Sequence, residues 1–481
     1  MPLPESVLAL DSLLNSLRNH KTDLLLQLEQ IDSNIAAAER KRAKLCNDAT
    51  FISKLPPELL SHIFLLCQKD HPAFQLVATQ VCTRWRDMSI GTPMLWADIR
   101  VHVEHPSHLQ LGLDKMETYL SRSGPSTLFA VRLTADANMD FSPFLKLIAN
   151  HISRCSHLSV RAWRNIKASW LLREHLECLR APHLLYLALH IDWADVGSYN
   201  RIMCDTPSIF KAGAPSLTSL QLTGYASALR PPISDGITTL HLDGVYMLKL
   251  SVLEYRQILG ANRCLLNLSL RGLKIDSDSP TSIESQALEL PMLRSLRIHA
   301  TEITRASLNA LLNALPLYRL ESLVLCDVDN FCSSEFPNVK DLSLHRCALP
   351  AEQIGHLLVA FPSVTRLTLE SESLLYVALS IGGSETARLP ILWPKLRIFC
   401  VRDLTVRNNV SALLKLVQER TRMNHPLDFL YLDSASRRRS ANILRALEVL
   451  TNIGRANDDP DPWPPGADMD SAEDDSFWDI D

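Results

Sequence analysis

The sequence predicts an α/β protein in which a long N-terminal helix and a short helical domain precede a solenoid of alternating strands and helices. Three observations lead to this fold class. Apolar residues follow a heptad pattern near the N-terminus, helix signals crowd residues 49–100, and one apolar template recurs between positions 158 and 432. We expect the solenoid to have a parallel inner sheet and outer helices.

Composition allows several domains. The chain has 481 residues, 46% of them hydrophobic, which suffices for about three domains of roughly 150 residues each. Residues 458–481 contain ten Asp or Glu and no Lys or Arg, so the formal net charge of −4 divides into −10 there and +6 for residues 1–457. This mild excess lacks the dense basic stripe that nucleic-acid binding needs, and no nucleic-acid partner is expected.

Cysteine usage and hydropathy indicate an intracellular protein. The eleven cysteines include no C-x-x-C pair, a pattern typical of reduced, buried thiols rather than of a zinc site or a disulfide framework. No basic region precedes an apolar run at the N-terminus, and no stretch approaches the ~18 apolar residues of a spanning helix. We therefore expect a cytoplasmic or nuclear location, no membrane partner and no cofactor.

Residues 1–48 are predicted to form one helix, because apolar or tolerated residues recur at alternating steps of three and four. These heptad positions are Leu10, Leu14, Leu17, Lys21, Leu24, Leu28, Ile31, Ile35, Ala38, Arg42 and Leu45. Polar Lys21 and Arg42 interrupt the apolar seam. Packing of this helix on its own domain fits the pattern as well as coiled-coil self-association or a helical hairpin does.

Residues 49–100 carry three short runs: L-P-P-E-L-L from Leu55, V-C-T-R-W-R from Val81, and P-M-L-W from Pro93. Within the first run, Pro57 preorganises the first turn of a helix and Glu58 suits its positive N-terminal end. A second helix is expected to begin near Pro72 and to end before Gly91. Its apolar stripe would comprise Val77, Val81, Trp85 and Met88. Read alone, these are ordinary core helices of a larger helical domain.

In this order and spacing the three runs resemble the F-box, a three-helix unit. F-boxes bind the Skp-type adaptor of SCF ubiquitin ligases, so the resemblance implies that partner here and, through it, a cullin ligase. The residues that match the motif, and are candidates for adaptor contact, are Leu55, Pro56, Glu58, Leu59, Ile63, Phe64, Val81, Trp85, Leu95 and Trp96. Trp85 and Trp96 suit a core role as well. A heptad helix before an F-box also resembles F-box proteins of basidiomycete fungi.

Within residues 155–432 a short sequence pattern, the template, recurs. Its apolar residues are spaced three and then two positions apart, and a Pro often precedes them, as in P-S-L-T-S-L-Q-L from Pro215. It starts at positions 182, 215, 235, 263, 291, 318, 337, 362 and 394. The intervals bracket the 20 to 29 residues of leucine-rich repeats, which the segment resembles. Helix patterns lie between strands at Leu308–Leu315, Ile354–Phe361 and Val410–Val417. The Asn or Cys of that repeat family appears once, as Cys347, so the array is irregular.

Residues between the template leucines are expected to line the inner surface of the solenoid. The candidates for binding a target protein are Tyr186, His190, His241, Arg271, Arg297, His299, His345 and Arg366. Each of them fits a solvated sheet face as well. The histidines lack the carboxylate or cysteine spacing of a metal site, so we expect no metal.

The remaining segments complete the domain plan: 101–154 as a linking segment, 433–457 as a C-terminal capping helix, and 458–481 as a disordered acidic tail. Trp463 and Trp478 in that tail also fit a short docking motif. The sequence contains no nucleotide-binding, HExxH or GxSxG motif, and we expect no catalysis. It thus predicts a substrate-recognition adaptor of a ubiquitin ligase, or alternatively a non-catalytic repeat scaffold without a ligase role.

Overall fold

The structure is a computed structural model that describes residues 5–136, 139–163, 165, 167–191, 209–224, 236–243, 249–250, 259–271, 274–275, 290–299, 308, 312, 315, 317–328, 335–347, 357, 359–370, 393–402, 404 and 407–455. Two compact units make up the chain. The first comprises Met1–Asp98 and Leu120–Thr127, and the second comprises Ile99–Tyr119 and the chain from Leu128 onward.

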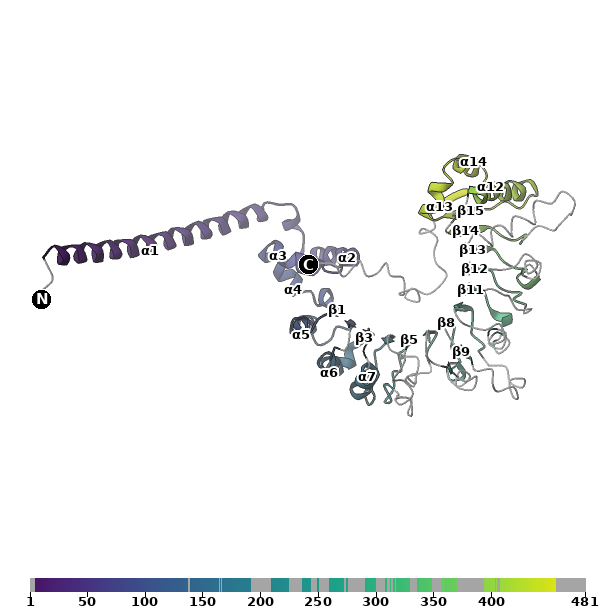
Figure 1. The fold of residues 1–481 in the computed structure, drawn as a ribbon, viewed down its shortest axis with the longest axis horizontal. Coiled ribbons are helices and arrows are strands. Elements are labelled where there is room, and N and C mark those ends of the chain that lie inside the picture. Colours follow the sequence, from purple (N-terminus) through teal and green to yellow (C-terminus); the bar gives the residue numbers. More distant parts are fainter. Residues whose placement is uncertain are drawn as a thin grey trace. The chain divides into compact units, whose positions relative to one another are not determined.

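Helix α1 (Glu5–Asp48) is one continuous helix of 44 residues, as the heptad pattern predicts (Figure 1). The leucines and isoleucines of the seam are all exposed along it. Nothing in the described chain covers them, and self-association through this seam stays a prediction.

Three helices and two 3-10 turns follow in the first unit. They are η1 (Ile52–Lys54), α2 (Pro57–Asp70), α3 (Phe74–Val81), α4 (Thr83–Ile90) and η2 (Pro93–Trp96). We expected a single helix where α3 and α4 lie. That expectation was wrong, because Cys82 is extended (φ −158°, ψ 169°) and breaks it in two. The break turns α4 so that Trp85 packs on Phe64 of α2.

In the second unit, fourteen of the described strands form one sheet in chain order. They are β1 (Asp98–Val103), β2 (Phe129–Ala135), β3 (Cys155–Ala162), β4 (Tyr186–Ile191), β5 (Ser219–Gly224), β6 (Thr239–Asp243), β8 (Asn267–Arg271), β10 (Ser295–His299), β11 (Ser322–Cys326), β12 (Asp341–His345), β13 (Arg366–Glu370), β14 (Ile398–Arg402), β15 (Phe429–Leu432) and β16 (Asn452–Arg455). Neighbours from β2 to β16 pair in parallel. A separate parallel pair joins β7 (Lys249–Leu250) to β9 (Lys274–Ile275).

The sheet begins earlier and ends later than we expected. The range 101–154, which we assigned to a linking segment, contains the second half of β1, all of β2, and helices α5 (Leu109–Arg122) and α6 (Ser142–His151). The range 433–457, expected to be one capping helix, contains two short helices, α13 (Ser434–Arg439) and α14 (Leu444–Glu448), and then strand β16. Both ends therefore contribute strands to the array.

Helices cover one face of the sheet. Figure 1 shows α5, α6 and α7 (Ala168–Leu176) on the same side of the first strands. The predicted helix at Val410–Val417 is confirmed within α12 (Arg407–Arg422). The other two predicted helices, at Leu308–Leu315 and Ile354–Phe361, lie largely outside the described residues.

The template leucines align across the strands and are buried. Leu268 pairs in register with Leu296, and Leu296 pairs with Leu323, so each repeat adds a step to one apolar ladder. Burying a leucine side chain contributes roughly 1.5–3 kcal/mol. Because successive side chains of a strand point to opposite faces, the residues between these leucines lie on the other side. We call that side the open face.

Among the described residues no helix is long and apolar enough to cross a membrane. Within the same part of the chain, no group of three or more His, Cys, Asp or Glu side chains is arranged to hold a metal ion.

Candidate functional sites

The helices of the first unit enclose a small apolar core. Leu60 and Phe64 of α2, Ala78 of α3, and Leu95 and Trp96 of η2 are all completely buried. The rings of Phe64 and Trp85 lie 4.8 Å apart, within the range of favourable aromatic contact. This core positions α2 against α3 and α4.

Trp96 is fixed by two polar contacts. Its indole N–H donates to the Ser89 carbonyl at 2.7 Å. The guanidinium of Arg122 stacks over its ring at 4.3 Å, a cation–π contact. Together with its complete burial, these contacts make Trp96 a core residue.

Arg84 ties helix α4 to the segment before α2. Its guanidinium donates to the Leu55 carbonyl at 2.6 Å and also to the Ser53 carbonyl. These bonds fix the backbone on which Leu55 and Pro56 stand. Arg84 thereby positions two of the residues that are predicted to contact an adaptor. Arg84 itself was not among the predicted residues.

Two exposed apolar stripes lie on the outside of the same helices. On α2, Leu59 (54% exposed), Ile63 (37%) and Leu66 (48%) follow one another at helical spacing. On α3, Val77 and Val81 are also exposed. Apolar stripes on two packed helices of a small domain are typical of a protein interface.

The structure separates the predicted adaptor-contact residues into two groups. Pro56, Glu58, Leu59, Ile63 and Val81 are exposed, and Leu55 and Trp85 are partly so. In contrast, Phe64, Leu95 and Trp96 have no accessible surface and belong to the core. Our prediction did not include Leu66, although it lies seven residues after Leu59 and the spacing could have revealed it.

The open face of the second unit consists of three rows of side chains that the strand register brings together. The middle row runs through Gln221, His241, Ser269 and Arg297, on β5, β6, β8 and β10. The third row runs through Asp243, Arg271, His299, Cys326 and His345 in the same way. The first row runs from Tyr186 on β4 through Ser219 on β5 to Asp341 and Arg366 on β12 and β13. All eight predicted target-binding residues lie in these three rows.

The described part of the open face is net positive between β8 and β14. Together with the two residues that directly follow β11 and β12, these strands carry five arginines, no lysine and three acidic residues on this face, an excess of two positive charges with histidines neutral. The arginines are Arg271, Arg297, Arg346, Arg366 and Arg402. The acidic residues are Asp327, Asp341 and Glu370.

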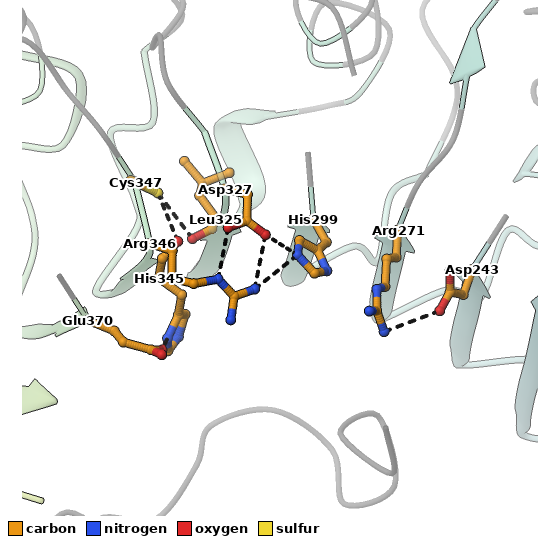
Figure 2. Close-up of polar contacts among 9 residues, drawn as sticks. All are labelled: Asp243, Arg271, His299, Leu325, Asp327, His345, Arg346, Cys347 and Glu370. Carbon is orange, nitrogen blue, oxygen red and sulfur yellow. Dashed lines mark hydrogen bonds and ion pairs between the residues drawn. The ribbon is translucent and has the colours of Figure 1, made fainter. Parts of the chain in front are cut away.

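A cluster of charged side chains lies near the middle of this face (Figure 2). Arg346 Nε donates to one carboxylate oxygen of Asp327 at 2.8 Å, and a terminal nitrogen donates to the other oxygen at 3.0 Å. His299 contacts the same carboxylate. This is a two-point arginine–carboxylate pair, the geometry that makes such pairs strong.

Backbone conformation turns both members of this pair toward each other. Asp327 and Arg346 directly follow β11 and β12, and both adopt the left-handed region, with φ of 53° and 47°. The backbone N–H of Asp327 donates to the carbonyl of His345, and the backbone N–H of Arg346 donates to the carbonyl of Glu370. Each acceptor lies on the next strand of the sheet. Asp tolerates this region more readily than Arg. The sequence gives no sign of this conformation, which explains why we did not predict either residue.

Two further ion pairs flank the cluster in Figure 2. A nitrogen of Arg271 lies 3.5 Å from a carboxylate oxygen of buried Asp243. On the other side, His345 Nδ1 contacts the carboxylate of Glu370. Each acidic side chain in this part of the open face thus lies next to a basic side chain or a histidine.

These contacts shift several pKa values. The hydrogen bond from Arg346 is the main cause that lowers the pKa of Asp327 to about 2. The hydrogen bond from His345 lowers the pKa of Glu370. Desolvation outweighs the Asp327 contact at His299 and lowers the pKa of this imidazole. Burial raises the pKa of the Cys326 thiol to about 11, although Arg297 and Arg346 oppose this shift.

Cys347 is the residue that we matched in the sequence to the Asn or Cys of leucine-rich repeats. Its buried thiol donates to the carbonyls of Leu325 and His345, at 3.5 and 3.3 Å. It therefore connects the turn after β12 with the neighbouring strand β11. This role is structural.

Aromatic groups mark the other end of the open face. The rings of Trp163 and His190 lie 5.0 Å apart, and His157 stacks on Tyr186 at 6.0 Å. The Tyr186 hydroxyl donates to Gln221 at 3.0 Å. The predicted residues Tyr186 and His190 are thus built into the sheet surface close to each other, whereas His299 and His345 belong to the distant charged cluster.

Comparison with known proteins bears on the first unit. No curated protein matches the chain. The family model described as F-box-like matches residues 52–102, the range that includes η1, the three short helices and η2. Residues 52–102 are therefore an F-box-like domain, joined to a parallel sheet of repeats.

Proposed function

We propose that this chain is a substrate-recognition adaptor of an SCF-type ubiquitin ligase. The observation that carries the proposal is the exposed apolar surface of the F-box-like domain, on Leu59, Ile63, Leu66, Val77 and Val81. The F-box family match suggests an adaptor role of this kind. A Skp-type adaptor is the partner that F-box domains generally bind, and a cullin ligase would be recruited through it.

The sheet would supply the second binding surface. Its open face is polar and rich in arginine, with the pair of Asp327 and Arg346 at fixed geometry. A rigid array of strands holds such side chains in place with little entropic cost on binding. The target protein would bind there and receive ubiquitin from other subunits, so the chain itself would do no chemistry.

Co-expression with a Skp-type adaptor tests the first half of the proposal. We expect wild-type protein to co-purify with the adaptor, and the double substitution Ile63→Asp and Val81→Asp to weaken binding at least tenfold. Each aspartate would place a charge in a desolvated apolar contact, which costs several kcal/mol. Both positions are exposed, so the helices should remain folded by circular dichroism.

A matched control uses Val449→Asp. Val449 is 84% exposed and lies in the second unit, so its substitution should leave adaptor binding unchanged. Failure of the wild-type protein to bind any Skp-type adaptor would favour the alternative, a non-catalytic repeat scaffold without a ligase role. Equal loss with Val449→Asp would show that the apolar stripes of α2 and α3 are not the contact.

A further inference from the structure

The open face and residues 458–481 have opposite charge. Between β8 and β14 the described part of the face has two more positive than negative side chains. The acidic segment contributes ten negative charges and no positive ones. Opposite charges on one chain attract with a strength that depends on how close they can come and on salt.

The attachment point lies on the same sheet. Strand β16 ends at Arg455, and 26 residues follow it. At up to ~3.4 Å per residue these could extend to ~88 Å. Seven strand steps separate β16 from β8, or about 34 Å at ~4.8 Å per step. The acidic segment is therefore long enough to cover the arginine-bearing strands from β8 to β14.

We propose that the acidic segment 458–481 docks in cis on the open face and occupies the surface around Arg297, Arg346 and Arg366. A tethered segment of this length acts at an effective concentration on the order of millimolar. A cis contact with a dissociation constant of about 0.1 mM would then weaken the binding of an acidic target segment about tenfold. The inference concerns regulation of the open face and does not depend on the ligase role.

A peptide with the sequence of residues 456–481, labelled with a fluorophore, is the probe. In the wild-type protein the attached acidic segment would compete with this peptide for the open face. A neutral-tail variant of the full chain, in which the ten acidic residues of 458–481 become Asn or Gln, removes that competition. We expect fluorescence anisotropy at about 50 mM salt to show that this variant binds the peptide at least tenfold more tightly than wild type. Raising the salt should weaken that binding, because the contacts are ionic.

Charge reversal identifies the surface. In the neutral-tail background, Arg297→Glu with Arg366→Glu should weaken peptide binding at least tenfold. The matched control reverses Arg180 and Arg263, which are exposed in the same unit but lie outside the three rows, and should change binding less than twofold. If the Glu variants lose their thermal transition, Arg297→Gln with Arg366→Gln tests the same point with less strain.

Three outcomes would overturn the proposal. Equal affinity of wild type and the neutral-tail variant for the peptide would mean that the face is open to acidic segments of other molecules. Absence of peptide binding by the neutral-tail variant would mean that the segment does not recognise the face. Equal losses in the Arg297/Arg366 and the Arg180/Arg263 variants would place the contact elsewhere.

Discussion

At the scale of single residues, the Asp327–Arg346 pair links two repeats. We expect Asp327→Asn to lower the free energy of unfolding by about 1 kcal/mol at pH 7, because the pair is partly exposed and screened by solvent. The folded-state pKa of Asp327, about 2, lies below its ordinary value. The contribution is therefore complete above about pH 4 and is lost as pH falls toward 2. Denaturant unfolding between pH 2 and 7 measures this.

A double-mutant cycle supplies the control for that pair. Arg346→Gln alone should cost about as much as Asp327→Asn, and the two together should cost little more than either. Additive losses would show that the 2.8 and 3.0 Å contacts contribute no coupling. A pH-independent effect of Asp327→Asn would contradict the assignment of the lowered pKa to Arg346.

Arg84 provides a second test at this scale. It donates to the carbonyls of Ser53 and Leu55, so Arg84→Ala should release this segment while the core around Phe64 stays intact. We expect faster hydrogen exchange of the amides of residues 52–55, and adaptor binding several-fold weaker. Arg84→Lys should not restore either, because an ammonium lacks the planar fork of a guanidinium.

The neighbouring Arg86 is the control for Arg84. It is exposed on the same helix, and Arg86→Ala removes the same charge without these two hydrogen bonds. Unchanged exchange at residues 52–55 in Arg84→Ala, or the same change in both variants, would rule out a positioning role for Arg84.

At the scale of elements, strand β16 depends on a glycine. A Cβ atom on Gly454 would lie 2.4 Å from Cε1 of Tyr431 on the adjacent strand, so the tyrosine ring packs directly over the glycine. Gly454→Ala should displace that ring and destabilise the second unit by about 1–3 kcal/mol. The melting temperature and the hydrogen exchange of β15 amides report the effect.

Gly260 is the matched control, because a Cβ atom there would meet nothing within 4 Å. Gly260→Ala should leave the melting temperature unchanged or slightly raised. A Gly454→Ala variant as stable as Gly260→Ala would mean that β16 does not pack against Tyr431 as the structure has it.

Sequence patterns predicted elements well where one signal repeats. The template leucines predicted strands from Leu187 to Val401, and the ladder through Leu268 and Leu296 has the register that this spacing requires. Strand β2 escaped because it lacks the template, although its residues alternate between buried and partly exposed positions. An alternation of period two was thus available as a signal for it.

Other features depended on contacts between distant residues. The helix break at Cys82 accompanies the packing of Trp85 on Phe64, a contact between distant residues that local helix preference does not encode. Similarly, Asp327 and Arg346 meet only because both backbones turn left-handed and neighbouring strands are in register. Burial of Phe64 and Leu95 also required the packed domain, since an apolar residue in a motif suits a core and an interface alike.

At the scale of the whole molecule, the chain combines two units that are stabilised by separate cores. In a repeat array each strand is stabilised mainly by its neighbours, so damage to one repeat should spread along the sheet rather than to another domain. Leu296 is completely buried in the ladder between Leu268 and Leu323. It is the position where this expectation can be tested.

Leu296→Ala should lower the free energy of unfolding of the second unit by about 2–5 kcal/mol, through lost burial and the cavity left behind. Hydrogen exchange should quicken in β8, β10 and β11, while the amides of α2 keep their protection and adaptor binding changes less than twofold. Met292→Ala, at an exposed side chain just before β10, serves as the control with little effect. If α2 lost protection together with β10, the two units would have to unfold as one, and the F-box-like domain would not present its apolar surface independently of the sheet.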